Sequence, residues 1–525
     1  MNTIVRDVLL RIWSPLERRL DQTAMYRTVT YALSFLAAVA AGLGFFGIVP
    51  YSPFDQIISL TVALSSGLLV NWLCSILWRV SVNMESAVIT ALILHFLIIP
   101  APLTALQDSW VIASVVVLAI LSKYIFAWRK QHVVNPAAAG LVLLALAYMV
   151  FDLPGYFEST WWIGRPELFV PLVLAGAAVV LKVRKWVPVI SFLTIAFIVF
   201  LIEEHRFAGE ISTVAVGNFW FSGSSLFLAF FMLTEPFMMP PTKRLQVVYG
   251  ASVGVISQTT LFLSVGLKMT PELALMIGNL LFYPATLRQK LIVSLVAMRE
   301  VAKDTMEFRF TKPVGLRFKA GQYLEWMLPH AGADDRGIRR YFTIASAPHD
   351  SELAFTVRFA PQVSSYKTAL HAMKPGGMIV ASQLAGDFTL PERVGEKVAF
   401  IAGGIGITPF ISHISHLTQE TAPTIDAVLF YCNNTVAEIA YRDRLQAATT
   451  TLPLRVVHIL AKEEVSGLEH GFLTEDIIRR HTPDFLERTW YISGPPGMVN
   501  AYTKLLLAMD IPRRRIKRDF FPGLA

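Results

Sequence analysis

The chain has 525 residues, of which 54% are hydrophobic and 16% charged, and its formal net charge is +8. This length exceeds that of a usual single domain, and the composition is typical of an integral membrane protein. The basic residues of the first half lie in short clusters between apolar segments, so membrane topology explains the charge better than a nucleic-acid partner does. Only two cysteines occur, which excludes a disulfide framework or a four-thiolate iron–sulfur cluster built from this chain alone.

Residues 1–27 combine arginines with an amphipathic stretch and lack the small-residue cleavage site of a signal peptide, so we expect a cytoplasmic N-terminal segment. Residues 28–288 form a predicted transmembrane domain of about ten helices. Its candidate spans lie near residues 28–48, 55–78, 86–100, 109–128, 136–151, 167–182, 186–202, 219–235, 245–267 and 271–286. The third and fifth are short for a crossing, and short segments at membrane depth are tolerated where they are buried or line a cavity.

Lys and Arg are frequent in alternate loops, for example at Arg79, Lys123, Lys185 and Lys243, and sparse in the loops between them. With ten crossings, this bias predicts a multi-pass protein of the cell inner membrane, in contact with membrane lipid. Both termini are then cytoplasmic, together with everything that follows the last span.

Beyond residue 288 the composition becomes that of a soluble protein. Alternating strands separated by Gly and Pro turns predict an antiparallel β-barrel over residues 289–395, and strands that alternate with helices predict a parallel α/β domain over residues 396–525. The predicted fold class is therefore multidomain, with a polytopic α-helical membrane bundle before these two domains.

A flavin site requires a positive charge for the pyrophosphate, an aromatic ring for stacking, and a hydrogen-bonding group near the reactive N5 atom. Arg340, Phe342 and Thr343 supply these in the spacing Arg-x-aromatic-Ser/Thr. The motif resembles that of the ferredoxin–NADP reductase family, in which it lies on one barrel strand and performs those roles. This resemblance implies that FAD is the cofactor and that Thr343 is catalytic.

Further segments follow in the order of that family and are similar to its other flavin contacts. Ser365 is expected to open a helix directed at the pyrophosphate. The residues expected to bind the flavin in these segments are Val357, Arg358, Ser365, Gly386, Asp387 and Phe388.

A strand-like run ending at Ile401 leads into a glycine-rich turn and then a helix. A tight turn alone explains such glycines, but the N–H groups at a helix start also meet phosphates. Ser493 begins a run similar to the family's Cys-Gly-Pro-Pro motif at the nicotinamide, and Phe521 resembles its C-terminal aromatic that covers the flavin; both are expected to be catalytic. The residues expected to bind the nucleotide are Gly403, Gly404, Gly406, Thr408, Pro409, Gly494, Pro495, Pro496 and Met498.

The resemblance therefore predicts an FAD-dependent NAD(P)H oxidoreductase. The segment after the second α/β strand, Tyr431–Thr435, offers no basic residue for the 2′-phosphate of NADPH, which favours NADH; Arg442 or Arg444 could still fold back to supply one.

In the membrane half, Asn135 and Pro136 begin a helix, and Glu235 stands in a Thr-Glu-Pro break. These motifs resemble the D subunit of the Rnf complex and the B subunit of the sodium-pumping NADH:quinone reductase. Those relatives carry a covalent flavin on a Ser-x-Ala-Thr motif, which is absent here, and Thr160 and Ser222–Ser225 are poor substitutes. Asn135 and Glu235 are expected to contact a non-covalent FMN or a quinone.

Other polar or aromatic residues of the membrane half leave alternatives open. His95 suits a redox role and an interhelical hydrogen bond equally well, whereas Trp161, Trp162 and Trp220 are expected in the outer aromatic belt. No metal site is expected, and a two-haem reductase is disfavoured because only His95 lies well within a span.

These features predict a membrane flavoprotein that takes hydride from NAD(P)H onto FAD and passes electrons to a quinone, a flavin relay, or a flavoprotein or iron–sulfur partner. The alternative is a redox-driven ion pump or transporter component. A mere membrane anchor would not need ten spans.

Overall fold

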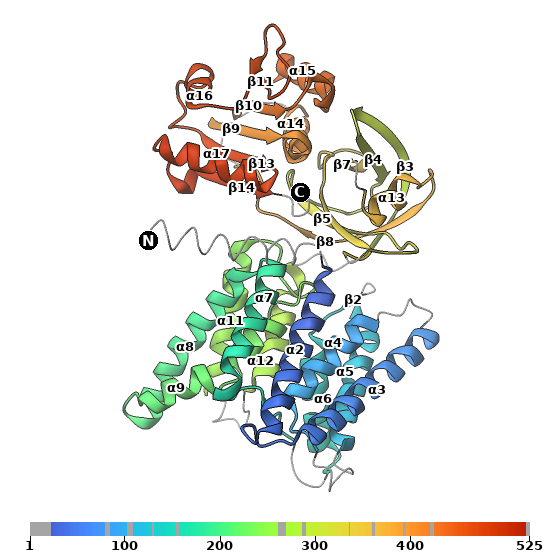
Figure 1. Cartoon of the computed structure of the whole chain (residues 1–525), viewed down its shortest axis with the longest axis vertical. Coiled ribbons are helices and arrows are strands. Elements are labelled where there is room, and N and C mark those ends of the chain that lie inside the picture. The colour runs from blue at the N-terminus through green and yellow to red at the C-terminus, as the bar shows by residue number, and fades with distance from the viewer. Residues whose placement is uncertain are drawn as a thin grey trace. The chain divides into compact units, whose positions relative to one another are not determined.

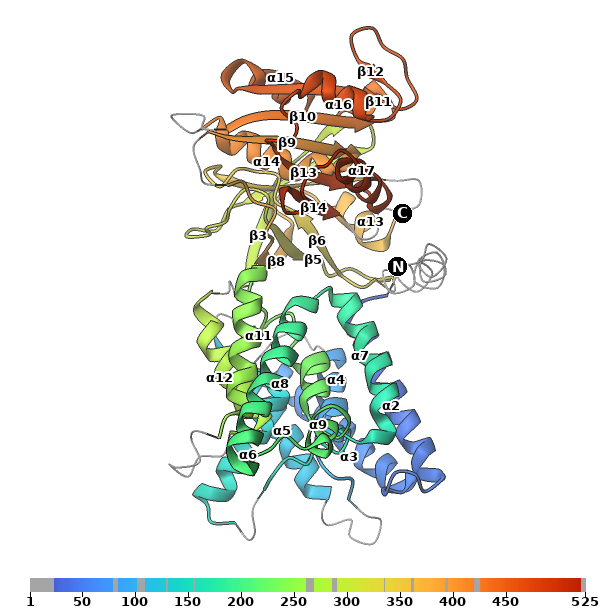
Figure 2. The same ribbon diagram turned by 90° about the vertical axis from the view of Figure 1, so that its left-hand side faces the viewer.

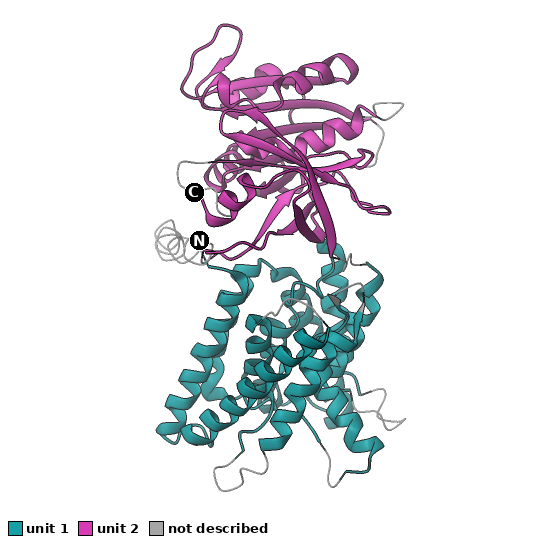
Figure 3. Ribbon diagram, turned by 90° about the vertical axis from the view of Figure 1, so that its right-hand side faces the viewer, with its two compact units in different colours: residues 1–289 teal, residues 290–525 magenta. Residues whose placement is uncertain are grey.

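The computed structural model describes residues 23–78, 84–101, 109–128, 131–153, 157–260, 269–285, 290–334, 336–359, 363–391, 395–419 and 425–520. The chain divides into two compact units, residues 1–289 and 290–525 (Figure 3). The boundary lies where the sequence changes from apolar segments to alternating strands.

The N-terminal unit is helical (Figure 1). Its helices are α2 (Met25–Phe45), α3 (Pro53–Leu77), α4 (Met84–Leu97), α5 (Ser109–Ile125), α6 (Pro136–Val150), α7 (Phe169–Val183), α8 (Trp186–Ala208), α9 (Thr213–Phe221), α10 (Ser225–Phe227), the π-helix η3 (Leu228–Met232), α11 (Lys243–Gln258) and α12 (Pro271–Phe282). Helical residues thus lie in each of the ten predicted segments. Among the described residues, five helical stretches are long and apolar enough to cross a membrane: Met25–Phe45, Pro53–Leu77, Pro166–Val183, Trp186–Ala208 and Thr213–Met232.

The packing of the first five segments is repeated by the second five. In the first half α3 packs against α5 and α5 against α6; in the second half α8 packs against α11 and α11 against α12 (Figure 2). Contacts of α2 with α7, and of α6 with α12, join the halves. The third segment of each half, α4 in one and α10 with η3 in the other, is the most deeply buried.

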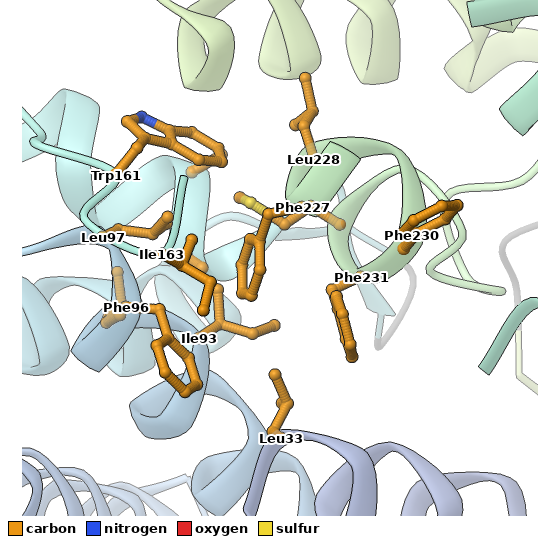
Figure 4. Close-up of a cluster of buried hydrophobic side chains, with 14 of the residues drawn as sticks. Leu33, Ile93, Phe96, Leu97, Trp161, Ile163, Phe227, Leu228, Phe230 and Phe231 are labelled. Carbon is orange, nitrogen blue, oxygen red and sulfur yellow. The ribbon is translucent and has the colours of Figure 1, made fainter. Parts of the chain in front are cut away.

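Aromatic rings from these two central segments meet in the middle of the unit. The ring centroids of Phe96 and Phe227 are 5.8 Å apart, and Phe227 stacks on Phe231 at 5.0 Å (Figure 4). The predicted short third span is therefore buried within the protein, as its length requires.

The prediction of an outer aromatic belt is wrong for two of its three tryptophans. Trp161 and Trp162 are 7% and 3% exposed, so neither ring faces the surroundings. The loop that carries them folds back onto α4, where the backbone N–H groups of Thr160 and Trp161 donate to the Leu97 carbonyl.

The C-terminal unit contains two six-stranded sheets. The first is antiparallel in the order β6-β5-β8-β3-β4-β7, built from β3 (Leu291–Ala302), β4 (Thr305–Thr311), β5 (Tyr323–Met327), β6 (Arg339–Thr343), β7 (Glu352–Arg358) and β8 (Met378–Ala385), with α13 (Ser365–His371) between β7 and β8. The predicted antiparallel domain is confirmed.

The second sheet is parallel, in the order β12-β11-β10-β9-β13-β14. Its strands are β9 (Glu396–Gly403), β10 (Ile425–Asn433), β11 (Leu454–Leu460), β12 (Glu469–His470), β13 (Thr489–Gly494) and β14 (Ile516–Phe520), and its main helices are α14 (Thr408–Leu417), α15 (Arg442–Thr451), α16 (Glu475–His481) and α17 (Pro496–Ala508). Separate apolar cores on its two faces, one including α14 and α15 and the other α16 and α17, confirm the predicted α/β domain.

Candidate functional site

The three residues of the predicted flavin motif lie on β6. The ring of Phe342 is partly exposed and stacks on Phe355, with centroids 4.8 Å apart and planes 18° apart. Thr343 is 3% exposed, and its Oγ1 has no hydrogen-bond partner among the described residues. A buried hydroxyl without a partner costs free energy, so this position suits a group that accepts or donates a hydrogen bond when a cofactor is bound.

Arg340 is held by a loop that the sequence did not mark as functional. Its Nη2 lies 3.2 Å from Asp334 Oδ1, and its Nη1 donates to the carbonyls of Arg336, Gly337 and Arg339. The guanidinium also lies 5.0 Å from the ring centre of Tyr366.

Asp334 joins Arg340 to Ser365, the two groups expected at the flavin pyrophosphate. The backbone N–H of Ser365 donates to Asp334 Oδ2 at 3.2 Å, and Ser365 Oγ accepts from the Asp334 N–H at 2.9 Å. Ser365 is the first residue of α13, as predicted, while the Ser364 side chain caps that helix. The carboxylate thus bonds to the same cation and amide that would meet a pyrophosphate.

Partial burial would raise the pKa of the Asp334 carboxyl, but Arg340 and the Arg336 amide hold that pKa below its usual range. The folded pKa is therefore lower than the unfolded one, so these interactions stabilise the protein above the ordinary Asp pKa of about 4, and this stability is lost as pH falls through the folded pKa. We expect Asp334→Asn to lower the free energy of unfolding of the FAD-free protein by about 1 kcal/mol at pH 7, and therefore to lower its melting temperature. The difference from wild type should shrink in thermal melts taken towards pH 3.5; a constant difference would show that the charge of Asp334 is not involved.

Arg358 connects the antiparallel sheet to the glycine-rich turn of the parallel one. Its Nη2 lies 3.1 Å from Glu438 Oε1, and its Nη1 lies 3.6 Å from the position that a Cβ on Gly404 would take. The sequence pattern did not indicate Glu438, which lies in a short 3-10 turn after β10. A basic side chain at this turn can neutralise a nucleotide phosphate.

The glycine-rich turn packs so closely against β13 that side chains would not fit. A Cβ on Gly406 would lie 2.4 Å from the Ser493 carbonyl oxygen, and a Cβ on Gly403 would lie 2.2 Å from Met498 Sδ. Gly404 has φ +50°, in the left-handed region that favours glycine. These contacts bring the two predicted nucleotide segments together at the carboxyl ends of β9 and β13, the edge where parallel sheets bind ligands.

We expect Gly406→Ala to destabilise the unit by about 1–3 kcal/mol and to raise KM for NADH on the order of tenfold or more, because the methyl group pushes the turn away from Ser493. Gly217→Ala in α9, outside the predicted nucleotide site, is the control, since nothing lies within 4 Å of a Cβ there. Steady-state reduction of ferricyanide measures both variants. An unchanged KM in Gly406→Ala would contradict the assignment of this turn.

Ser493 is completely buried, and its Oγ also lacks a hydrogen-bond partner among the described residues. The helices after the two segments begin as expected, with Thr408 and Pro409 in the first turn of α14 and Pro496 as the first residue of α17 after Pro495. Thr343 and Ser493 are two buried hydroxyls of the C-terminal unit without a partner among the described residues, and such groups suit the predicted contacts to FAD and to a nicotinamide respectively. Bound together, these groups would supply hydride transfer.

Two residues expected to bind the cofactor have side chains that are too deeply buried for direct contact with it. Val357 and Phe388 are 2% and 6% exposed, and Phe388 packs edge-on against Tyr491 inside a core. Asp387 is exposed and Gly386 has φ +124°. Phe521 lies outside the described residues; β14 ends one residue before it, at Phe520 beside Gly494.

Asn135 and Glu235 of the N-terminal unit, far apart in sequence, are in direct contact. Asn135 Nδ2 donates to Glu235 Oε2 at 2.7 Å, while its Oδ1 accepts from the Ala138 N–H and so caps α6. His132, which the sequence did not single out, lies with Nε2 2.9 Å from Glu235 Oε1. The hydrogen bond between Asn135 and Glu235 thereby connects the start of α6 to the break after η3. This is a structural role that both residues fulfil without a ligand.

Comparison with known proteins agrees with this geometry. Residues 400–504 match the Oxidoreductase NAD-binding domain family. A flavohemoprotein of Xylella fastidiosa is 26% identical over 209 residues, which are 39% of this chain and 51% of that protein. The reductase subunit of an aromatic O-demethylase from an Amycolatopsis species is 27% identical over 237 residues, 44% of this chain and 69% of that protein. A crystal structure of an Amycolatopsis cytochrome P450 reductase aligns with a TM-score of 0.40 at 25% identity, over 44% of this chain and 70% of that one.

The C-terminal unit therefore resembles a ferredoxin–NADP reductase-like module with an NAD-binding domain, and this similarity supports the prediction of an FAD-dependent NAD(P)H oxidoreductase for this unit. The chain spans about half the length of the flavohemoproteins that it matches.

Proposed function

We propose that the whole chain is a membrane-bound flavoprotein that takes hydride from NAD(P)H onto FAD and passes electrons to an acceptor in the membrane, a quinone or a flavin relay. The observation that carries the proposal is the presence, in one chain, of the reductase-like module and a helical unit with five stretches able to span a membrane. FAD suits this function because it accepts two electrons and can release them singly.

The exposed surface of the N-terminal unit supports a membrane location. Large apolar side chains along α8 are exposed, including Ile190, Ile198, Ile202 and Phe207, and the same holds for α2 and α3. A soluble surface rarely carries such extended apolar faces, whereas lipid covers them at no cost. We place the protein in the cell inner membrane, with the C-terminal unit cytoplasmic because of the charge bias of the loops.

Two classes of electron acceptor fit the proposed function, a protein partner and an acceptor in the membrane. The relatives include, by name, reductase subunits or components of an aromatic O-demethylase and a propane 2-monooxygenase. An iron–sulfur or flavoprotein partner is therefore a second acceptor class, alongside a quinone or a non-covalent FMN in the N-terminal unit. The proposal that this unit is related to the Rnf D and Nqr B subunits, which rests on its sequence motifs, favours the membrane acceptors.

NADH is the favoured reductant. Just after β10, Glu463 Oε2 accepts from the Val436 N–H at 2.7 Å, and Arg358 is already paired with Glu438 in the same turn. Arg444, one of the two arginines that could fold back, lies 4.0 Å from Asp350 instead. A carboxylate near this edge opposes the extra phosphate of NADPH.

The test is NADH oxidation by purified full-length protein, with and without a short-chain quinone, together with flavin content before and after acid precipitation. We expect turnover that depends on the quinone, with FAD released by acid. Turnover with ferricyanide alone would leave a reductase that needs a protein partner, and acid-resistant flavin would point to a covalent relay.

An ion pump or transporter component is the alternative function. Two observations support it. The packing of five segments is repeated in each half, and an odd number of crossings would invert the second half relative to the first. The helix of the eighth segment is also irregular, because it ends in the π-helix η3. Sealed vesicles that accumulate sodium or protons on addition of NADH, with loss of the gradient on adding an ionophore, would favour this alternative.

A further inference from the structure

The N-terminal unit contains a cavity of about 430 Å³ that no step of the proposed reaction uses. Its wall combines three aromatic side chains with hydroxyl groups and the rim residues Ile99 and Met269. The hydroxyl-bearing residues besides Tyr51 are Ser159, Thr160, Ser222, Ser224 and Thr270. The volume lies within the range of about 300–1,000 Å³ that is usual for small-molecule sites.

One residue of the wall has an unusual backbone. Trp161 has φ +47°, in the left-handed region that a bulky side chain rarely adopts. Such a conformation costs about 1–3 kcal/mol and persists where the surroundings fix it, often at ligand sites. Here Trp161 Nε1 donates to Ser159 Oγ at 3.0 Å, and Ser159 donates to Glu272 Oε1 at 2.8 Å.

The loop that bears Trp161 is pressed against the break between α9 and α10. A Cβ on Gly164 would lie 2.7 Å from the Gly223 carbonyl oxygen, so the two backbones are as close as glycine permits. This approach brings the serines on either side of Gly223 into the same wall as Thr160. Trp162 completes it, with its ring centroid 5.4 Å from that of Tyr51 and its Nε1 bonded to the His95 carbonyl.

Among the described residues, the charged side chains at the cavity are mostly acidic. Arg165 and Glu158 line it, and Arg165 Nε lies 3.4 Å from Glu167. Glu272 is 5% exposed, and its Oε2 has no hydrogen-bond partner among the described residues. Within the described part of the chain, three carboxyl groups thus lie near one guanidinium, a balance that disfavours a phosphate, whereas aromatic walls with hydroxyl groups suit a neutral planar ring with polar oxygens.

We propose that this cavity binds the head group of a neutral lipid quinone, with the ring against the aromatic wall, the carbonyl oxygens at the hydroxyl groups of Ser222, Ser224 and Thr270, and the tail leaving past the exposed Ile99. The chemistry of the cavity indicates a neutral ring with polar oxygens. The choice of a quinone among such molecules rests on the proposed function.

The test is calorimetric titration of the full-length, FAD-saturated protein in detergent with a decyl-substituted benzoquinone. We expect binding at one site, weakened at least tenfold by Ser224→Met, which fills the cavity, and by Trp161→Gly, which removes the ring while keeping the backbone conformation favourable. Ser65→Met, on the exposed face of α3, is the matched control and should bind as wild type does. FMN, which carries a phosphate, should not compete.

Wild-type affinity in both cavity variants, no binding by wild type, or competition by FMN would each overturn the proposal. NADH reduction of ferricyanide is measured alongside and should be equal in all variants, because none lies in the C-terminal unit. Its loss in wild type would refute the proposed reductase function and leave the binding result to stand by itself.

Discussion

Replacement of Thr343 by Val should slow reduction of bound FAD by NADH tenfold or more, which corresponds to the loss of one hydrogen bond of about 1.4 kcal/mol or more. The hydroxyl is buried without a partner in the protein, so its role depends on a bound group. Stopped-flow measurement of flavin bleaching gives the rate directly. FAD occupancy should remain that of wild type.

The stability of the same variant provides the control. Valine has nearly the shape of threonine and carries no polar atom that needs a partner, so the FAD-free variant should melt at the same temperature as wild type or higher. Thr343→Ser, which keeps the hydroxyl, should restore most of the rate. A slow Thr343→Ser variant, or a Thr343→Val variant that reduces FAD at the wild-type rate, would exclude a hydrogen-bonding role for this residue.

Arg340→Ala should weaken FAD binding on the order of 10- to 100-fold, because hydrogen bonds to a charged group contribute about 1.5–3 kcal/mol each. Fluorescence titration of the FAD-free protein with FAD measures the effect. The reduction rate at saturating FAD should change much less than the affinity, since the guanidinium lies at the pyrophosphate end of the predicted site.

Arg340 also holds its own loop, so two comparisons separate charge from loop order. Asp334→Ala breaks the ion pair but keeps the guanidinium, and should bind FAD as tightly as wild type or more tightly. Arg317→Ala removes an exposed arginine of the same domain and should have no effect. If Asp334→Ala lost as much affinity as Arg340→Ala, the loop rather than the charge would account for the result.

The residues of the predicted reductase site lie in local patterns, which is why the sequence alone could mark them. Arg340, Phe342 and Thr343 lie within four residues of one strand, and Gly406 stands in a turn whose position between strand and helix is visible in the pattern. Asp334 and Glu438 were missed because each acts through a partner on another element, in a loop without periodicity. Nothing in the residues around them marks that partner.

The N-terminal half was less predictable for a physical reason. Apolar periodicity locates helices, but in segments as uniformly apolar as these it does not separate buried faces from exposed ones. Trp161 and Trp162 therefore read as belt residues, although hydrogen bonds from their loop to Leu97 and His95 turn both rings inward. The pairing of Asn135 with Glu235 is likewise a contact between distant segments that single motifs do not reveal.

The strand order of the parallel sheet has a consequence for the biosynthesis of the chain. β9 lies between β10 and β13, with Val398 paired to Thr489, and β14 adds the last strand at one edge. Contacts so distant in sequence form slowly, because a long loop must close before any of them is gained. The N-terminal unit is synthesised earlier, so it should be in place while one edge of β9 is still unpaired. Maturation of the reductase should therefore be the late step, and the nascent enzyme should be most sensitive to proteases and aggregation at that stage.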